Sequence, residues 1–182
     1  VTVFATRLSW TKLVMSAERI ELISEARFDL NRTRQESACR HLFDALDDVK
    51  DPEIPVMSIW DLGVLQNIER RDNQVRVTIT PTYSGCPAIG QIEQDIVARL
   101  AQAGEHQVEI LMCLSPAWST ELLSQATKAR LQKYGVSPPG SNCCPQCGSE
   151  DIEVISEFSS TACKALHRCR SCLEPFDHFK TL

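Results

Sequence analysis

Two C-x-x-C units near the end of the chain restrict its fold more than any other feature of the sequence. Cys144 and Cys147 form the first unit, Cys169 and Cys172 form the second, and 21 residues separate them. Two residues between paired cysteines allow a tight turn to direct both sulfurs at one ion, and four thiolates provide the tetrahedral environment that suits zinc. We therefore predict a structural zinc site made by these four cysteines. Rubredoxin-type iron and free or disulfide-bonded thiols are the alternatives.

The C-terminal segment, residues 143–182, is too short to bury a hydrophobic core of its own. Metal binding would supply the free energy of folding that such a small unit lacks. Stretches at 152–156, 165–168 and 176–179 are predicted to form strands around the metal. The sequence thus predicts a zinc-ribbon-like β unit, which a proline- and glycine-containing linker at 137–142 joins to the rest of the chain.

The residues ahead of this linker carry the signals of a separate α+β domain, because helical and strand periodicities alternate along them. The predicted elements are helices at about 36–49, 87–103 and 115–134 and strands at 63–70, 75–80 and 107–114. We predict a small three-stranded sheet with flanking helices over residues 36–136. Residues 1–35 have only weak periodicity and are interpreted as a poorly ordered or partly helical extension.

Cys86 is the main candidate for chemistry outside the cysteine-rich tail. It lies between the second predicted strand and the helix that follows, so the unpaired amides and the positive end of the helix dipole would stabilise its thiolate. Asp51 and Asp61 lie in loops that could converge near it. A thiolate with two carboxylates could hold iron or an iron–sulfur cluster transiently. In the alternative interpretation, Cys86 is an inert packing residue and each aspartate is a turn or capping group.

The remaining cysteines have weaker signals. Cys163 precedes Lys164, a cation that would favour a thiolate, so it is either an additional functional thiol or a half-buried strand residue. Cys39 and Cys113 follow apolar patterns and are interpreted as packing residues. The four histidines show no assignable role and are expected at the surface; they are His41, His106, His167 and His178.

Charge and hydropathy exclude several classes of function. The formal net charge is −5, and residues 143–182 contain four basic and six acidic residues. A surface that neutralises phosphates needs the reverse, so we predict no nucleic-acid partner. No stretch approaches the roughly 18 apolar residues of a membrane span. The first 15 residues lack the apolar region and cleavage site of a signal peptide, so we expect a cytoplasmic protein.

Several motifs resemble a known family. The segments D-P-E-I-P-V at 51–56, D-L-G at 61–63 and C-P at 86–87 resemble the MIP18-like family, also called the domain of unknown function 59 family, whose members are linked to iron–sulfur assembly. Within residues 37–182, further segments are similar to the family of D subunits of bacterial phenylacetyl-CoA epoxidases. These segments are 80–87, 116–118, 134–135, 137–139, 155–158, 160–166 and 174–177.

The resemblance implies an accessory role in aerobic phenylacetate degradation. It implies that the chain helps to mature a metallocentre of its partners, the di-iron oxygenase or the iron–sulfur flavin reductase of the epoxidase system. It does not imply epoxidation, and the sequence has neither the Glu-x-x-His ligands of a di-iron site nor a glycine-rich flavin loop. A structural zinc-ribbon interaction protein that delivers no metal is the alternative, and homo-oligomerisation is left open.

Overall fold

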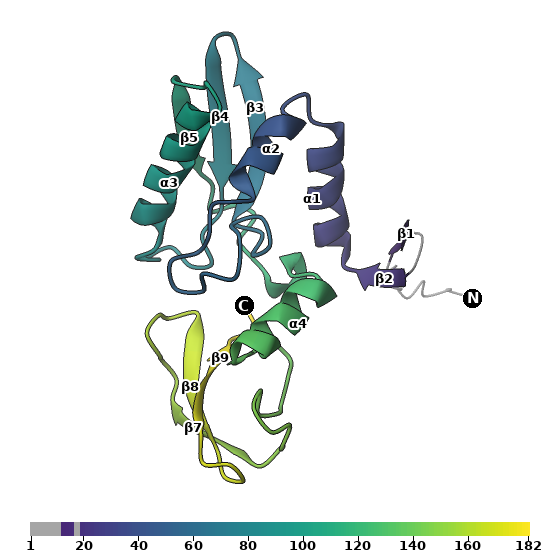
Figure 1. Cartoon of the computed structure of the whole chain (residues 1–182), viewed down its shortest axis with the longest axis vertical. Coiled ribbons are helices and arrows are strands. Elements are labelled where there is room, and N and C mark those ends of the chain that lie inside the picture. The colour runs from purple at the N-terminus through teal and green to yellow at the C-terminus, as the bar shows by residue number, and fades with distance from the viewer. Residues whose placement is uncertain (1–11, 17–18) are drawn as a thin grey trace, which may run out of the picture.

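The computed structural model describes residues 12–16 and 19–182, with side chains described from Ile23 onward. An α+β domain lies at one end and a four-stranded sheet at the other, with helix α4 (Gln125–Tyr134) between them (Figure 1). This arrangement confirms the α+β fold class predicted from the sequence. The predicted absence of a signal peptide concerns mainly residues 1–11, which lie outside the described residues.

The sheet of the α+β domain is small and mixed. Strands β3 (Leu65–Arg71), β4 (Gln74–Ile79) and β5 (Val108–Met112) lie in the order β3-β4-β5. β3 and β4 form an antiparallel pair, whereas β4 and β5 are parallel because helix α3 (Ile89–Gln102) connects them as a crossover. The apolar residues of the period-two pattern on β4 are all fully buried. The predicted three-stranded sheet is therefore confirmed.

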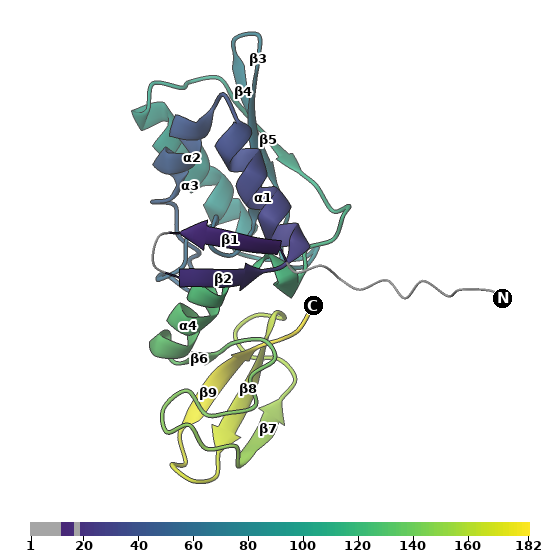
Figure 2. The same cartoon turned by 90° about the vertical axis from the view of Figure 1, so that its right-hand side faces the viewer.

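The N-terminal segment contributes more structure than its weak periodicity indicated. β1 (Lys12–Ser16) and β2 (Arg19–Ile23) form an antiparallel hairpin, and β2 lies beside α4 (Figure 2). Helix α1 (Glu25–Glu36) follows, and the hydroxyl of its N-cap Ser24 accepts a hydrogen bond from the first turn. Leu30 of α1 is buried in the core of the α+β domain. Part of the segment predicted as an extension thus packs on the domain.

The helix predicted at 36–49 is shorter in the structure, because its first residue ends α1 and a short break precedes helix α2 (Arg40–Leu46). Helix α2 begins only after Ser37, whose hydroxyl accepts a hydrogen bond from the backbone N–H of Cys39 at 3.0 Å. This local bond offers the backbone an alternative to the helical pattern, so α1 ends before α2 starts. Cys39 is buried at the N-cap of α2, in agreement with its interpretation as a packing residue.

The helix predicted at 115–134 is also divided. A 3₁₀ turn, η1 (Thr120–Leu122), precedes α4, and the Ser124 hydroxyl caps the first turn of α4. α4 ends at Gly135, which adopts a left-handed conformation with φ +99°. Among the described residues, no helix combines the length and the apolar character that crossing a membrane requires.

The C-terminal region folds as a four-stranded sheet. Strands β6 (Val136–Ser137), β7 (Ile152–Ser156), β8 (Lys164–Cys169) and β9 (Pro175–Phe179) lie in the order β6-β9-β8-β7. The last three are antiparallel neighbours at the predicted positions, whereas β6 pairs in parallel with β9. Ser137, the first residue of the predicted linker, therefore lies within this sheet, which we call the ribbon.

The ribbon and the α+β domain share one apolar core. Phe179 of β9 packs on Trp118 with ring centroids 5.8 Å apart, and Trp118 donates from Nε1 to the Leu62 carbonyl at 2.8 Å. Cys163 lies directly before β8, at the start of the β8–β9 hairpin of the ribbon, and belongs to the same buried cluster. A second cluster, made by Cys144, Cys169 and Phe176, lies inside the ribbon. The shared core fixes the ribbon against the loops that precede α3.

Two of the four histidines depart from the expected surface positions. His167 is buried, and its ring stacks on that of the half-buried His178 with centroids 4.8 Å apart. The surface prediction is wrong for His167 because it faces Phe176 and His178 across the β8–β9 pair. His41 and His106 are exposed as expected.

We predict opposite stability effects for alanine at two glycines. Gly63 has φ +66°, and an added Cβ would lie 2.6 Å from the Cβ of Leu122, so Gly63→Ala should lower the free energy of unfolding by about 1–3 kcal/mol. Gly90 lies in α3 with open space around it, so Gly90→Ala should raise stability by about 0.5 kcal/mol. Urea unfolding measures both. Equal stabilities for the two variants would contradict the close contact between Gly63 and η1.

Candidate functional site

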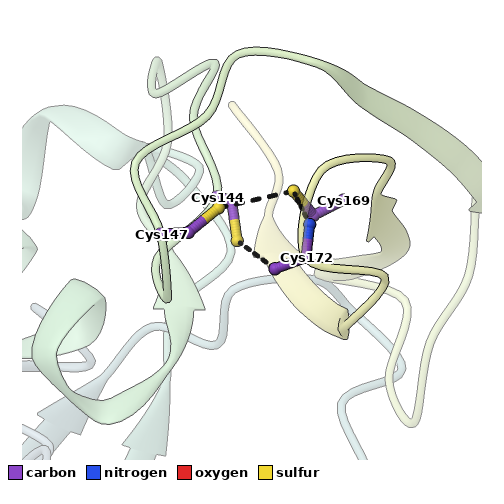
Figure 3. A group of neighbouring side chains, drawn as sticks. All are labelled: Cys144, Cys147, Cys169 and Cys172. Atoms are coloured by element: carbon purple, nitrogen blue, oxygen red, sulfur yellow. Dashed lines mark hydrogen bonds between the residues drawn. The ribbon is translucent and has the colours of Figure 1, made fainter.

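The two C-x-x-C units meet inside the ribbon. Cys144 and Cys147 lie in the turn between β6 and β7, while Cys169 ends β8 and Cys172 follows it (Figure 3). The four Sγ atoms all lie within 4.8 Å of one another, and the Cys144–Cys172 and Cys147–Cys169 sulfurs are 3.7 and 3.6 Å apart. A tetrahedron with metal–sulfur bonds of about 2.3 Å has sulfur–sulfur edges of about 3.8 Å. The donor set therefore fits one tetrahedral ion.

The backbone around these sulfurs is folded into two tight turns. Gly148 has φ +74° and donates its N–H to the Cys144 carbonyl at 2.9 Å, which closes the first turn. In the second turn the N–H of Cys172 donates to the Cys169 sulfur at 3.5 Å. Hydrogen bonding by this amide is the main cause that lowers the pKa of Cys169 to about 6. Both turns direct their thiols at a common centre, and the amide of Cys172 stabilises negative charge on Cys169.

A second group of reactive side chains lies where the ribbon meets the α+β domain. A narrow cavity of about 20 Å³ opens there, between the loops that precede α3 and the start of the ribbon hairpin. Its chemically active lining consists of two thiols, two carboxylates and one lysine: Cys86, Cys163, Asp51, Glu53 and Lys164. We call this the junction pocket. The sequence predicted two of these residues, Cys86 and Asp51, as neighbours, and it left the role of Cys163 open.

Cys86 is half-buried at the entrance of α3. Burial is the main cause that raises the pKa of its thiol, and the negative charge of Asp51 adds to the rise. The backbone N–H groups of Ala88 and Ile89 donate to the sulfur and lower the pKa, but they do not compensate. The thiolate expected from the helix start is therefore wrong as a resting state, because desolvation outweighs the helix terminus.

The two predicted aspartates lie in different environments. Asp51 lines the junction pocket, and its Oδ1 accepts the N–H groups of Glu53 and Ile54 at 2.8 and 2.9 Å. Burial nevertheless raises the pKa of Asp51. Asp61 does not line the pocket.

Asp61 is held by local partners instead. Its carboxylate accepts the Ser58 N–H at 3.0 Å and forms an ion pair with Arg130 of α4. Burial alone would raise the pKa of Asp61, but these hydrogen bonds outweigh it and lower the pKa. The structure therefore places Asp51 with Cys86 in the lining of the junction pocket, whereas Asp61 lies outside that lining and pairs with Arg130.

A buried lysine joins the two sides of the junction pocket, and the sequence did not identify it as functional. Lys164 of β8 is only 3% exposed, and its Nζ lies 3.0 Å from Asp177 and 3.7 Å from Glu53. Ser160 also donates to Glu53 at 3.0 Å. These contacts hold the ribbon hairpin against the loop of Asp51. Only the unusual pairing of a lysine with Cys163 in the sequence pointed to this position.

Cys113, which we interpreted as an apolar packing residue, lies at the surface end of the sheet. It is half-buried, and its Sγ donates to the Ser115 carbonyl at 3.0 Å. It does not line the junction pocket and is not part of the four-sulfur group. It therefore provides a matched control thiol for substitutions at Cys86 and Cys163.

Comparisons with known families match both regions of the chain. Residues 40–112 match the iron–sulfur cluster assembly protein family, and residues 132–180 match the PaaD zinc β-ribbon domain. The two matches correspond to the α+β domain and to the ribbon with the end of the helix that precedes it. The four-sulfur group lies within the second match, and the junction pocket draws its residues from both.

Individual proteins are similar to this chain over parts of its length. A protein of Escherichia coli (strain K12) described as the D subunit of 1,2-phenylacetyl-CoA epoxidase is 43% identical over 75% of this chain and 89% of its own length. An Fe-S protein maturation auxiliary factor of Porphyromonas gingivalis is 34% identical over 47% of this chain and 83% of its own length. A solved domain of unknown function 59 from Bacillus anthracis, 27% identical, aligns over 57% of this chain and 95% of its own with a TM-score of 0.47.

We predict that the ribbon depends on its ion. We expect the wild-type ribbon to bind about one ion per chain and Cys169→Ser to lose it, and β7–β9 of this variant should lose protection from amide hydrogen exchange. The matched control is Cys143→Ser, which removes the thiol next to Cys144 without touching the four-sulfur group. Metal analysis and hydrogen-exchange mass spectrometry measure both properties. Full ion content and protection in Cys169→Ser would refute the assignment.

A further prediction concerns the pH dependence of Cys86. Because its pKa is raised in the folded chain, a larger fraction of the thiol is protonated at pH 7 than in the unfolded chain. The rate of alkylation by iodoacetamide should rise with a midpoint at higher pH in the folded protein than in urea. Mass spectrometry of the Cys86 peptide gives both profiles. A folded midpoint below the unfolded one would show a helix-stabilised thiolate.

Proposed function

The chain belongs to the family of D subunits of 1,2-phenylacetyl-CoA epoxidases, and we propose that it assists the maturation of a metallocentre in that epoxidase system. Its matches to the iron–sulfur cluster assembly protein family and to the PaaD zinc β-ribbon domain support this proposal. In this proposal the junction pocket handles iron or an iron–sulfur cluster as cargo, and the ribbon holds a structural zinc ion. The target is the iron–sulfur flavin reductase or the di-iron oxygenase. The chain itself does not perform the epoxidation.

The observation that carries the proposal is the position of Cys86. Its half-buried thiol lies beside Asp51 in the junction pocket, within the segment that matches the iron–sulfur assembly family. The relative from Porphyromonas gingivalis, named as a maturation auxiliary factor, is similar over a length close to that of the same segment. A sulfur and a carboxylate at one small opening suit a metal that must be bound and released.

The protonated state of Cys86 supports cargo handling over storage. A metal ion must replace the thiol proton to bind, so a raised pKa weakens apparent affinity at neutral pH. Asp51 lies close enough to influence this thiol electrostatically, so it is placed to receive the proton or to contact the incoming ion. Weak binding favours transfer to an acceptor whose site is complete.

The zinc ion proposed for the ribbon has a different role. Zinc undergoes no redox chemistry, and four thiolates leave it no open coordination position. The zinc ion would hold the two turns of the ribbon together. The small cluster of Cys144, Cys169 and Phe176 buries too little apolar surface to stabilise the turns in the absence of the ion. We assign oxygen activation to the partner proteins, since the sequence lacks the Glu-x-x-His ligands of a di-iron site.

The test replaces the thiol in cells that make the epoxidase system. With Cys86→Ser, the purified reductase or oxygenase should contain less iron, by roughly tenfold if the thiol is a required ligand. Cys113→Ser should leave the iron content unchanged. Iron and acid-labile sulfide analyses of both partner proteins identify which one is matured. Normal loading of both partners by Cys86→Ser would remove the proposal.

A structural role in protein–protein interaction is the second candidate. Three apolar side chains on or beyond β7 are more than half exposed, namely Val154, Ile155 and Phe158. Exposed apolar groups of this kind suit a protein–protein contact. This candidate predicts that the chain co-purifies with the oxygenase and that Cys86→Ser has no effect on metal content, whereas Phe158→Ser abolishes co-purification.

A further inference from the structure

Cys163 brings a second thiol to the junction pocket. It precedes β8, is 9% exposed, and belongs to the core that the ribbon shares with the α+β domain. Its Sγ lies 3.1 Å from the Thr161 hydroxyl. Both Cys163 and Cys86 line the same narrow cavity, and the two thiols interact electrostatically. Docking of the ribbon therefore places two sulfurs from distant parts of the sequence on one opening.

We propose that Cys86 and Cys163 together bind a single Fe²⁺ ion through two sulfurs, as an incompletely coordinated transfer site. The proposal rests on the proposed function and deepens it, because it names the cargo and assigns the ribbon a direct part in binding. On binding, each thiol loses its proton to solvent or to Asp51, and two iron–sulfur bonds form. The oxidation state of the iron does not change.

The size of the cavity favours one ion over a cluster. A volume of about 20 Å³ exceeds the roughly 10–15 Å³ needed for one water molecule, so it accommodates a single small species. A cluster of several irons and sulfides needs many times this volume. The lining also includes the buried apolar side chains of Ile54, Leu62 and Phe179. A cluster would therefore have to separate the ribbon from the domain.

The local charges favour a divalent cation. Ionised Cys86 and Cys163 would repel each other and Asp51, and all three line the pocket. Lys164 offsets only part of this charge: it lowers the pKa of Asp51, but its ammonium group also lies between Glu53 and Asp177. A soft divalent ion neutralises two thiolates directly, and thiolate sulfur is a donor that iron accepts readily.

The number of ligands favours transfer over storage. Among the described residues, only the four cysteines of the ribbon form a group of three or more metal-ligating atoms within 4.8 Å of one another. The junction pocket thus provides two sulfurs without a preformed complete set of ligands. A tetrahedral ion bound there keeps positions open. An acceptor protein can add its own ligands at those positions before the two cysteines dissociate from the ion.

The contacts around Cys163 explain how the ribbon keeps its thiol in place. Lys164 and Ser160 both contact Glu53, and the backbone N–H of Ala162 donates to the Tyr83 hydroxyl oxygen. These three contacts join the segment that carries Cys163 to the two loops that carry Asp51 and Cys86. The zinc ion proposed for the ribbon would support the same geometry from the other end of β8.

The test uses anaerobic, reduced full-length protein with its ribbon filled by zinc. Co²⁺ serves as the probe, because its sulfur-to-metal charge-transfer absorption reports the number of thiolate ligands, and zinc release is measured in parallel. Wild type should bind about one Co²⁺ beyond the zinc. Cys163→Ser should lose about half of the charge-transfer intensity and bind Co²⁺ roughly tenfold or more weakly. Cys113→Ser should match wild type.

Cys163→Ala provides a second variant that keeps the buried position apolar, and circular dichroism with zinc content shows that each variant is folded. Wild-type absorption and affinity in both Cys163 variants would overturn the proposal, as would a folded wild type that binds no Co²⁺ beyond its zinc. If only Cys86→Ser loses the probe, the two-sulfur site is wrong while the proposed function stands. If both cysteines bind Co²⁺ but Cys86→Ser matures its partners normally, the proposed function fails while the site stands.

Discussion

The contact between Phe179 and Trp118 is the interaction on which the rest of the structure depends. It places the last strand of the ribbon on the loops of the α+β domain, and the Trp118 indole in turn bonds to the carbonyl of Leu62. An aromatic pair of this kind contributes about 0.5–1.5 kcal/mol beyond its area burial. Without it, Cys163 and Lys164 would be held near Cys86 only by the contacts of Lys164 and Ser160 with Glu53 and of Ala162 with Tyr83. The junction pocket is thus a product of docking between two units.

The two groups of cysteines differ in the number and arrangement of their sulfurs, and this difference suits different roles. The ribbon supplies four sulfurs at distances that fit a closed tetrahedron, which is the property of a structural site. The junction pocket supplies two thiols, and burial raises the pKa of Cys86. A closed site retains its ion, and an open site with a protonated ligand releases it. Under the proposed function, one small chain would therefore combine a structural metal site at one end of β8 with a metal-exchange site at the other.

Much of this arrangement was predictable from local sequence. The spacing of the four ribbon cysteines predicted a common site because a tight turn directs both sulfurs of each pair, and the periodicities predicted all three strands of the domain sheet. The break at Ser37 was missed because a hydroxyl that bonds the backbone leaves no mark on hydrophobic periodicity. The pKa direction of Cys86 was missed because the sequence shows a helix start but not the burial around it. The ion pair between Lys164 and Glu53 was missed because it depends on long-range packing, which no local sequence pattern indicates.

X-ray absorption at the iron K-edge tests the central claim most directly, on protein whose ribbon is filled with zinc and to which Fe²⁺ is added anaerobically. The account predicts two sulfur neighbours per iron, with the remaining neighbours oxygen or nitrogen, and zinc that stays bound. Four sulfur neighbours would mean that iron enters the ribbon instead. A shell of oxygen and nitrogen alone would contradict the role of both thiols at the junction pocket.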